Sequence, residues 1–228
     1  MNTLALLNGI RFIDSFFPSG GYAFSSGLEA AVQAGAVTDG ASLSRYVEDL
    51  LRGGLGRREA VAIGFAHDAV MSRAVDLALS ADRELDAMKL GRESRLASRQ
   101  MGRQVVRIAV EQMEFCTLLQ QFHGKLEEGL TAGHLPVVMG LVLAACGWAR
   151  REAIAAYLYH SAVGLVSAGM KLLPVGQRES QRLLYEWTPM IVDLSRDAAL
   201  RDRQSSWTPV QDIYAMRHSR LQSRLFRS

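Results

Sequence analysis

Lysine, cysteine and proline are the residues that this sequence uses least. Lysine occurs only at positions 89, 125 and 171, so arginine supplies almost all of the positive charge. Arginine forms paired hydrogen bonds with carboxylates and phosphates and is weakly hydrated, which suits a protein interface, although a GC-rich genome would favour arginine codons equally well. The two cysteines, Cys116 and Cys146, form no CxxC motif. This argues against a disulfide framework and predicts a reducing, cytoplasmic setting.

The scarcity of proline and of alternating strand patterns predicts a helical protein. No proline occurs between residues 19 and 135, so long helices can form there without interruption. One helix is indicated by the apolar spacing of Leu43, Tyr46, Val47, Leu50 and Leu51. We expect Asp39 or Ser42 to cap this helix and Gly53-Gly54 to end it.

Helical spacing recurs along most of the chain. The other expected helices cover residues 25–36, 59–79, 93–122, 136–147, 151–171, 178–186, 190–202 and 210–225. With 49% hydrophobic and 21% charged residues among 228, the composition is that of a folded protein. No repeat or low-complexity linker divides the chain. We therefore predict an all-α fold, a single-domain helical bundle of roughly eight to ten helices.

Neither a signal peptide nor a membrane span is expected. The first residues, MNTLALLNGIRFIDS, lack the basic region and the long apolar core of a signal peptide. Residues 135–149 and 153–170 contain no Asp, Glu, Lys or Arg. The first stretch is too short to span a bilayer, and the second contains His160, Ser161 and Gly164. We expect both to be buried central helices that are apolar on all sides.

The stretch DSFFPSGGYAFSSGLEAA, residues 14–31, is dense in aromatic, serine and glycine residues. It lacks the lysine of a phosphate-binding loop and does not fit the GxSxG pattern of a nucleophile turn. We expect residues 18–21 to form a turn and Ser25 or Ser26 to cap the next helix, with Glu29 in its positive first turn. The stretch therefore predicts a rigid turn that fixes the start of a helix.

The titratable residues indicate no catalytic or metal site. The five histidines, at 67, 123, 134, 160 and 218, are not paired with other ligands at zinc spacing, apart from the adjacent His67-Asp68. We expect His160, in an apolar helix, to be a hydrogen-bonded core residue. The sequence leaves open a catalytic triad assembled from distant residues, but no pattern suggests one.

Two arginine stripes occur at helical spacing. The first comprises Arg92, Arg95, Arg99, Arg103 and Arg107, and the second Arg217, Arg220, Arg224 and Arg227. Such stripes are usually solvated faces, and the net charge of +3 alone does not indicate nucleic acid. The alternative function is a helical nucleic-acid-binding protein that uses the Arg92–Arg107 stripe. The C-terminal stripe carries Leu225-Phe226 between arginines, which predicts an element that docks on a partner.

Five segments in order resemble the urease accessory protein UreF family. They are FFPSGGYAFSSGLEAAV at 16–32, ASRQMGRQ at 97–104, GHLPVVMG at 133–140, LLPVGQRESQ at 172–181 and MRHSRLQSRLFRS at 216–228. Each segment alone is a weak match, but together they are specific. Ser219 stands where the family usually has an acidic residue, which puts a local ion pair there in doubt. Between Gln177 and Gln181 this chain has Arg178-Glu179-Ser180, whereas the family more commonly has small and acidic residues at these positions.

The resemblance implies an all-helical, dimeric urease maturation factor that is not itself an enzyme, has no cofactor and works in the cytoplasm. It implies binding to UreD, called UreH in some systems, and recruitment of the GTPase UreG to the apo-urease subunits for nickel insertion. It implies one domain, 1–228, with an N-terminal segment 1–24 and a C-terminal docking tail 210–228. The dispersed His and Cys residues define no nickel site, although a dimer could bring two copies together.

Partner-binding residues are expected in three places. They are Tyr22, Phe24 and Glu29 in the N-terminal turn, Gln177 and Gln181 in the Gly-Gln…Gln loop, and Arg220, Arg224, Leu225, Phe226 and Arg227 in the tail. By this hypothesis Leu225 and Phe226 become buried anchors on UreD, and the arginines steer binding toward an acidic surface.

Overall fold

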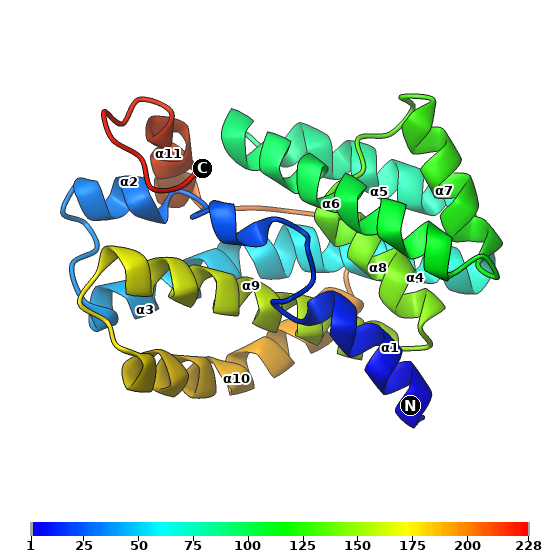
Figure 1. Ribbon diagram of the computed structural model, residues 1–228, viewed down its shortest axis with the longest axis horizontal. Helices are drawn as coiled ribbons and strands as arrows, with labels where there is room; N and C mark the ends of the chain where they lie inside the picture. Colours follow the sequence, from blue (N-terminus) through cyan, green and yellow to red (C-terminus); the bar gives the residue numbers. More distant parts are fainter. Residues whose placement is uncertain (1, 228) are drawn as a thin grey trace.

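The computed structural model describes residues 2–227, and within them the chain is helical and contains no strand (Figure 1). The α-helices are α1 (Thr3–Ile13), α2 (Leu28–Gln33), α3 (Gly40–Leu50), α4 (Ala60–Ser72), α5 (Val75–Met88), α6 (Arg92–Gln112), α7 (Thr117–Glu127), α8 (Leu135–Ala145), α9 (Arg150–Leu172), α10 (Gln177–Ala199) and α11 (Pro209–His218). A 3-10 turn, η1 (Gly21–Ala23), and a π-helix, η2 (Leu51–Glu59), complete the set. The predicted all-α, single-domain bundle is confirmed.

The centre of the bundle is the pair α4 and α8. Every residue from Leu135 to Ala144 is buried, because α8 is apolar on all sides and packs between α4, α6 and α9. Gly140 permits the close approach of the two central helices, since a Cβ there would lie 2.6 Å from the carbonyl oxygen of Ile63. The expected burial of the 136–147 helix is therefore confirmed.

Helix α9 is the other long apolar element. By length and composition alone it is the one described helix that could cross a membrane. Half of its most apolar window is buried inside the fold, and it packs against α4, α8 and α10.

Several helix boundaries differ from the sequence predictions. The expected 59–79 helix divides at Arg73, which adopts a left-handed φ of 56°, and the expected 93–122 helix divides at Met113. The expected break between 186 and 190 is absent, because α10 runs through Pro189. The ring of Pro189 lies on the exposed side of the helix, where water can reach the backbone carbonyl that loses its intrahelical bond.

The glycines expected to end α3 serve a different purpose. The π-helix η2 continues α3 directly into α4 through Gly53 and Gly54. The Gly53 carbonyl accepts a hydrogen bond of 2.9 Å from the N–H of Trp207, and a Cβ on Gly53 would lie 2.5 Å from the Trp207 carbonyl oxygen. Glycine is needed here because the segment that enters α11 lies directly against the π-helix.

Candidate functional site

The N-terminal turn places the start of α2 against α11. Gly27, with φ of 84°, is the N-cap of α2, and a Cβ there would lie 2.7 Å from the backbone nitrogen of Ala215. The expectation that Ser25 or Ser26 is the cap is therefore wrong. Ser26 is itself left-handed, with φ of 54°. Ser25 still supports the helix start, because its Oγ accepts from the Glu29 N–H at 3.4 Å.

Glu29 is buried in the first turn of α2 and binds the C-terminal tail. Its carboxylate accepts from the backbone N–H groups of Leu225 at 2.6 Å and Phe226 at 3.1 Å. The Nε2 atom of His218 lies 2.9 Å from the same carboxylate. Burial raises the pKa of Glu29, but the hydrogen bonds from Leu225, His218 and Phe226 outweigh it and leave the pKa below the ordinary value of 4.5.

His218 joins α11 to both α2 and α6. Its side chain is fully buried, and its Nδ1 lies 2.8 Å from the carboxylate of Glu93, which also binds Arg224 at 3.0 Å. Each ring nitrogen thus faces a carboxylate oxygen, so His218 connects Glu29 of α2 with Glu93 of α6. We call Glu29, Glu93, His218 and Arg224 the tail junction.

The tail itself is not a helix beyond His218, so the expected helix over 210–225 is wrong in its second half. The N–H groups of Leu225 and Phe226 bond to Glu29 instead of to helical carbonyls, and the Arg227 N–H donates to the Ala23 carbonyl at 2.7 Å. Phe226 is 6% exposed, under the ammonium of Lys171, whereas Leu225 is 64% exposed. The tail therefore presents Leu225 outward while it buries Phe226 within this chain.

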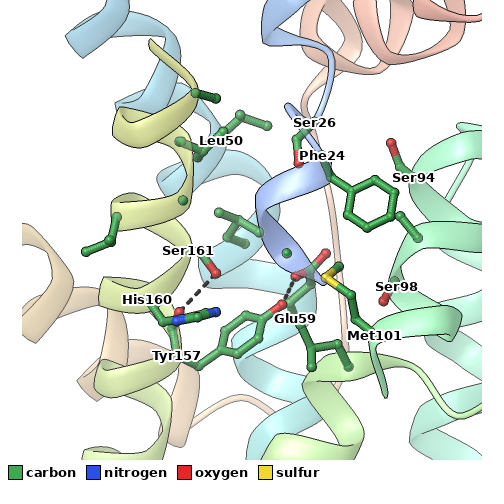
Figure 2. A pocket seen from close by; sticks show the side chains of 18 of the residues that line it. Phe24, Ser26, Leu50, Glu59, Ser94, Ser98, Met101, Tyr157, His160 and Ser161 are labelled. Atoms are coloured by element: carbon green, nitrogen blue, oxygen red, sulfur yellow. Dashed lines mark hydrogen bonds between the residues drawn. The ribbon is translucent and has the colours of Figure 1, made fainter. Parts of the chain in front are cut away.

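A cavity of about 420 Å³ lies beneath the N-terminal turn. Figure 2 shows Phe24 directed from the turn toward α6, with Met101, Tyr157 and Glu59 around the same space. Phe226 closes part of it. Phe24 therefore contributes to this wall, while the side chain of Tyr22, another expected partner-binding residue, lies outside the described part of the structure.

The carboxylate in the cavity wall, Glu59, is tightly paired. Glu59 accepts from the Tyr157 hydroxyl at 2.5 Å and pairs with Lys89. Burial raises the pKa of Glu59, but the charges of Lys89 and Arg58 lower it to about 2, so the carboxylate stays ionised. His160, as expected, is a hydrogen-bonded core residue, with Nδ1 2.8 Å from the Ile13 carbonyl oxygen.

The arginines of the α6 stripe lie in two different environments. Arg99 binds Asp86 through Nε at 2.9 Å, and Arg103 contacts the Ala132 carbonyl. Arg92, Arg103 and Arg107 are exposed, whereas Arg99 is half-buried. Part of the stripe therefore stabilises the fold and part faces solvent.

Gln177 and Gln181 lie apart from the tail. Both are exposed in the first turns of α10. Figure 1 shows α10 and α11 on opposite sides of α9. The expected partner-binding residues thus form at least two surfaces, one around the tail junction and one at the start of α10.

Metal ligands do not gather in the part of the chain that the structure describes. No group of three or more His, Cys, Asp or Glu residues there has a geometry that could hold a metal ion. Cys116 and Cys146 are buried free thiols, and burial raises the pKa of Cys146 to about 11, which disfavours the thiolate that binds metals.

The tail junction contains residues that the sequence reading did not select. Glu93 is not singled out by any sequence pattern, and His218 is one of five dispersed histidines, yet they meet Glu29 and Arg224. The doubt raised by Ser219 does not matter for His218, because its carboxylate partners come from α2 and α6. The sequence pointed to a role for His218 only through the resemblance of the terminal segment, residues 216–228, to the family pattern.

Comparison with known proteins covers nearly the whole chain. The sequence model of the UreF family matches residues 37–188. The chain is 33% identical over 222 residues to the urease accessory protein UreF of Actinobacillus pleuropneumoniae serotype 5b, which covers 96% of this chain and 97% of that protein. It is 32% identical over 228 residues to proteins of the same name from Yersinia pestis (strain Pestoides F) and Yersinia pseudotuberculosis serotype IB, with 99% of each chain covered.

Proposed function

Because this chain belongs to the UreF family of urease accessory proteins, we propose that it is a non-catalytic urease maturation factor of the cytoplasm. It binds UreD, called UreH in some systems, and the pair recruits the GTPase UreG to apo-urease so that nickel can be inserted. The protein brings no cofactor of its own, and its role is to assemble the other components.

The observation that carries this proposal is the way the tail is held. Hydrogen bonds to Glu29 hold the backbone of Leu225 and Phe226, so the tail is ordered before a partner binds. A fixed segment with an outward leucine loses little conformational entropy when it binds a partner. Leu225 is therefore the anchor toward UreD, and Phe226 positions it from within this chain.

The other expected residues have supporting roles in this proposal. Phe24 and Glu29 shape the turn on which the tail rests, and exposed Arg220 and Arg227 steer an acidic partner toward it. Gln177 and Gln181 belong to a second surface, available to another component of the assembly. Arg224 is partly occupied by Glu93, so it orients the tail rather than contacting the partner directly.

We also propose that the protein works as a homodimer. Support comes from α1, whose Leu4, Leu7 and Ile10 repeat at helical spacing and remain exposed. An apolar stripe of this kind is a normal feature of a surface that another copy covers. Light scattering on the purified chain should give the mass of two chains, and the mass of one chain at micromolar concentration would contradict this part.

The experiment for the proposed function is co-expression with the UreD homologue from the same genome. Full-length protein is compared with a chain ending at His218, which keeps α11 and the contact of His218 with Glu29 but lacks Leu225 and Phe226, whose N–H groups donate to Glu29. Size-exclusion chromatography with light scattering should show a complex with the full chain and none with the shortened one. Circular dichroism must show that the shortened chain is still helical.

A matched pair of substitutions locates the anchor. Leu225→Ala should weaken the complex about five- to tenfold, because truncating an anchor at the well-packed centre of an interface costs about 1 kcal/mol or more. Leu200→Ala is the control, since Leu200 is also exposed (83%) but lies at the end of α10. Equal affinities for both variants would contradict the anchor role, and no complex with the full chain would contradict binding to UreD.

A further inference from the structure

A serine, a histidine and an aspartate from α5, α6 and the start of α8 meet at one wall of the cavity beneath the N-terminal turn. The Oγ of Ser98 on α6 lies 3.0 Å from Nδ1 of His134, the residue that precedes α8. The Nε2 of the same ring lies 2.8 Å from Oδ1 of Asp86 on α5. The sequence left open a catalytic triad assembled from distant residues, and these contacts have the order of one, from hydroxyl to imidazole to carboxylate.

The chemistry of these partners decides which ring nitrogen of His134 carries the proton. An ionised carboxylate only accepts hydrogen bonds, so Nε2 donates its hydrogen to Asp86. In the neutral ring, Nδ1 is then the acceptor for the Ser98 hydroxyl. Burial lowers the pKa of His134 below 6.5, although the nearby Asp82 and Asp86 raise it, so the ring is neutral at about pH 7. His134 is therefore able to take a proton from Ser98.

Ser98 is reached from the cavity, whereas His134 is fully buried. Ser98 belongs to the lining of this space of about 420 Å³. Figure 2 shows Ser94, Ser98 and Met101 along the α6 wall. Phe24 and Met101 make part of the lining apolar, which suits a short aliphatic group. A small molecule in the cavity can therefore meet the hydroxyl, while the imidazole that activates it stays protected from bulk water.

The same cavity has a buried cation that is only partly paired. Arg58 belongs to the lining and is 8% exposed. Its Nη1 donates to the Ser206 hydroxyl at 3.2 Å, but among residues 2–227 its Nε has no hydrogen-bond partner. Lys89, whose ammonium pairs with Glu59, belongs to the same lining. Cations in a cavity of this kind favour a carbonyl oxygen that gains negative charge when its carbon is attacked.

We propose that Ser98 is a nucleophile that takes the acyl group of a small ester of a short carboxylic acid bound in this cavity. The Oγ forms a bond to the carbonyl carbon and passes its proton to Nδ1 of His134. The bond from that carbon to the alcohol oxygen breaks, and His134 gives the proton to the leaving alcohol. Asp86 is a positioning residue, because it orients the imidazole and stabilises its charged form. This reaction is separate from the proposed role in urease maturation, in which the chain assembles other components.

The nucleophile is tested with purified full-length protein and p-nitrophenyl acetate. Absorbance follows the release of p-nitrophenolate, and peptide mapping by mass spectrometry should place the acetyl group on Ser98. Ser98→Ala should lower the rate of release at least about tenfold, because it removes the attacking oxygen. Ser94→Ala is the matched control, since Ser94 lines the same cavity four residues earlier in α6, and it should change the rate less than about twofold.

The roles of the imidazole and the carboxylate are tested by the pH profile of acetylation. The charges that act on His134 are those of Asp82, Asp86 and Lys89, and Arg99 pairs with Asp86. The rate in the unaltered protein should rise through the lowered pKa of His134 and level off near about pH 7. Asp86→Asn should slow acetylation at least about tenfold and move the midpoint to lower pH, because the lost negative charge lowers the pKa of His134 further. If Asp86 only supported the fold, the midpoint would not move.

A conservative variant separates chemistry from packing. Ser98→Cys should still be acetylated at position 98, now as a thioester, because a thiol is also a nucleophile. Equal rates for the unaltered protein and Ser98→Ala, or acetyl groups found only on lysine side chains and the terminal amine, would overturn the inference. Melting curves must show that each variant keeps the fold. Because no partner protein is present in these reactions, their failure would leave binding to UreD intact, and failure to bind UreD would leave this inference intact.

Discussion

Two junctions in this protein fix a non-helical segment with the same chemistry. The tail junction holds residues 224–226, and a second junction holds residues 131–134, which lead into α8. We call the second one the loop junction, and it consists of Asp82, Asp86, Arg99 and His134. Each has a fully buried histidine beside carboxylates, an arginine paired with one of those carboxylates, and a carboxylate that accepts backbone N–H groups.

The loop junction is built into the centre of the fold. Asp82 of α5 accepts from the N–H groups of residues 132, 133 and 134, at 2.8, 2.9 and 2.8 Å. His134 contacts Asp86 through Nε2 at 2.8 Å and Ser98 through Nδ1 at 3.0 Å. Three helices therefore meet at an internal segment that cannot leave unless the bundle opens.

The tail junction differs because it lies outside the central pair of helices. Residues 224–227 are held by Glu29 of α2, Glu93 of α6 and the carbonyl of Ala23, not by α4 or α8. We therefore predict that the same set of side chains is a permanent part of the fold at the loop junction and a reversible restraint at the tail junction. Reversibility is what a docking element requires, because a partner can then bind, reshape or replace the held segment.

The largest expected difference comes from removing the carboxylate of each junction. Asp82→Ala should lower the free energy of unfolding by about 3–5 kcal/mol, because buried N–H groups lose their only carboxylate acceptor. Glu29→Ala should lower it by about 1 kcal/mol or less, since the tail can detach and hydrate. Urea unfolding followed by circular dichroism measures both. A similar loss of stability in the two variants would contradict the distinction.

The glycine of each junction sharpens the comparison. A Cβ on Gly102 of α6 would collide with the carbonyl oxygen of Gly133, and one on Gly27 would lie 2.7 Å from the backbone nitrogen of Ala215. Gly102→Ala should cost about 2–4 kcal/mol of folding free energy, because two core elements must separate. Gly27→Ala should cost roughly 1–2 kcal/mol, from its positive φ and the displaced α11.

Thermal unfolding of the two glycine variants checks this order. Gly35→Ala is a useful control, because Gly35 also has a positive φ, of 73°, but its added Cβ would meet no atom. The loss of stability that comes from the positive φ alone can then be subtracted from the loss measured for Gly27→Ala. If Gly27→Ala were no worse than Gly35→Ala, the contact between α2 and α11 would be loose.

Acidification should weaken the loop junction before the tail junction. Burial lowers the pKa of His134 below 6.5 despite the nearby carboxylates, so its contribution to stability is complete above pH 6.5 and is lost as pH falls through the lowered pKa. The lowered pKa of Glu29 keeps its contribution complete above pH 4.5, and it is lost only as pH falls through that lower value.

Hydrogen exchange as a function of pH tests this sequence of events. Global stability should begin to fall below about pH 6.5, while the amides of Leu225 and Phe226 should stay protected until the pH is below about 4.5. Loss of protection at those two amides near pH 6, before any global change, would show that Glu29 is not their main acceptor.

The sequence predicts those features that depend on neighbours along the chain. Either Asp39 or Ser42 was expected to cap α3; Asp39 is the N-cap, and the two residues form a reciprocal capping box. The burial of α8 follows from ten consecutive residues without charge or strong polarity. Helical spacing in these segments reflects contacts within one or two turns, which is why it survives in the folded protein.

The tail junction could not be predicted in this way. His218 lies 125 residues from Glu93 and 189 residues from Glu29 along the chain. Spacing of the terminal arginines favoured a helix, but the buried carboxylate of Glu29 offers the tail N–H groups a stronger acceptor than helical carbonyls. Tertiary contact therefore overrides local propensity after His218.

The smallest expected effect concerns the cation over Phe226. The ammonium of Lys171 lies 5.2 Å from the centre of that ring, and an exposed contact of this kind is worth about 0.5–1 kcal/mol. Lys171→Met keeps most of the aliphatic contact and removes the charge, so exchange protection of the Phe226 amide should fall about two- to fivefold. Lys125→Met, on α7, should leave that amide unchanged. A loss of exchange protection as large as that caused by Glu29→Ala would mean that the buried Phe226 ring, more than the Glu29 carboxylate, holds the tail in place. Unchanged protection would leave the hydrogen bonds to Glu29 as the main restraint, and a partner would then need to compete with that one carboxylate to release the tail.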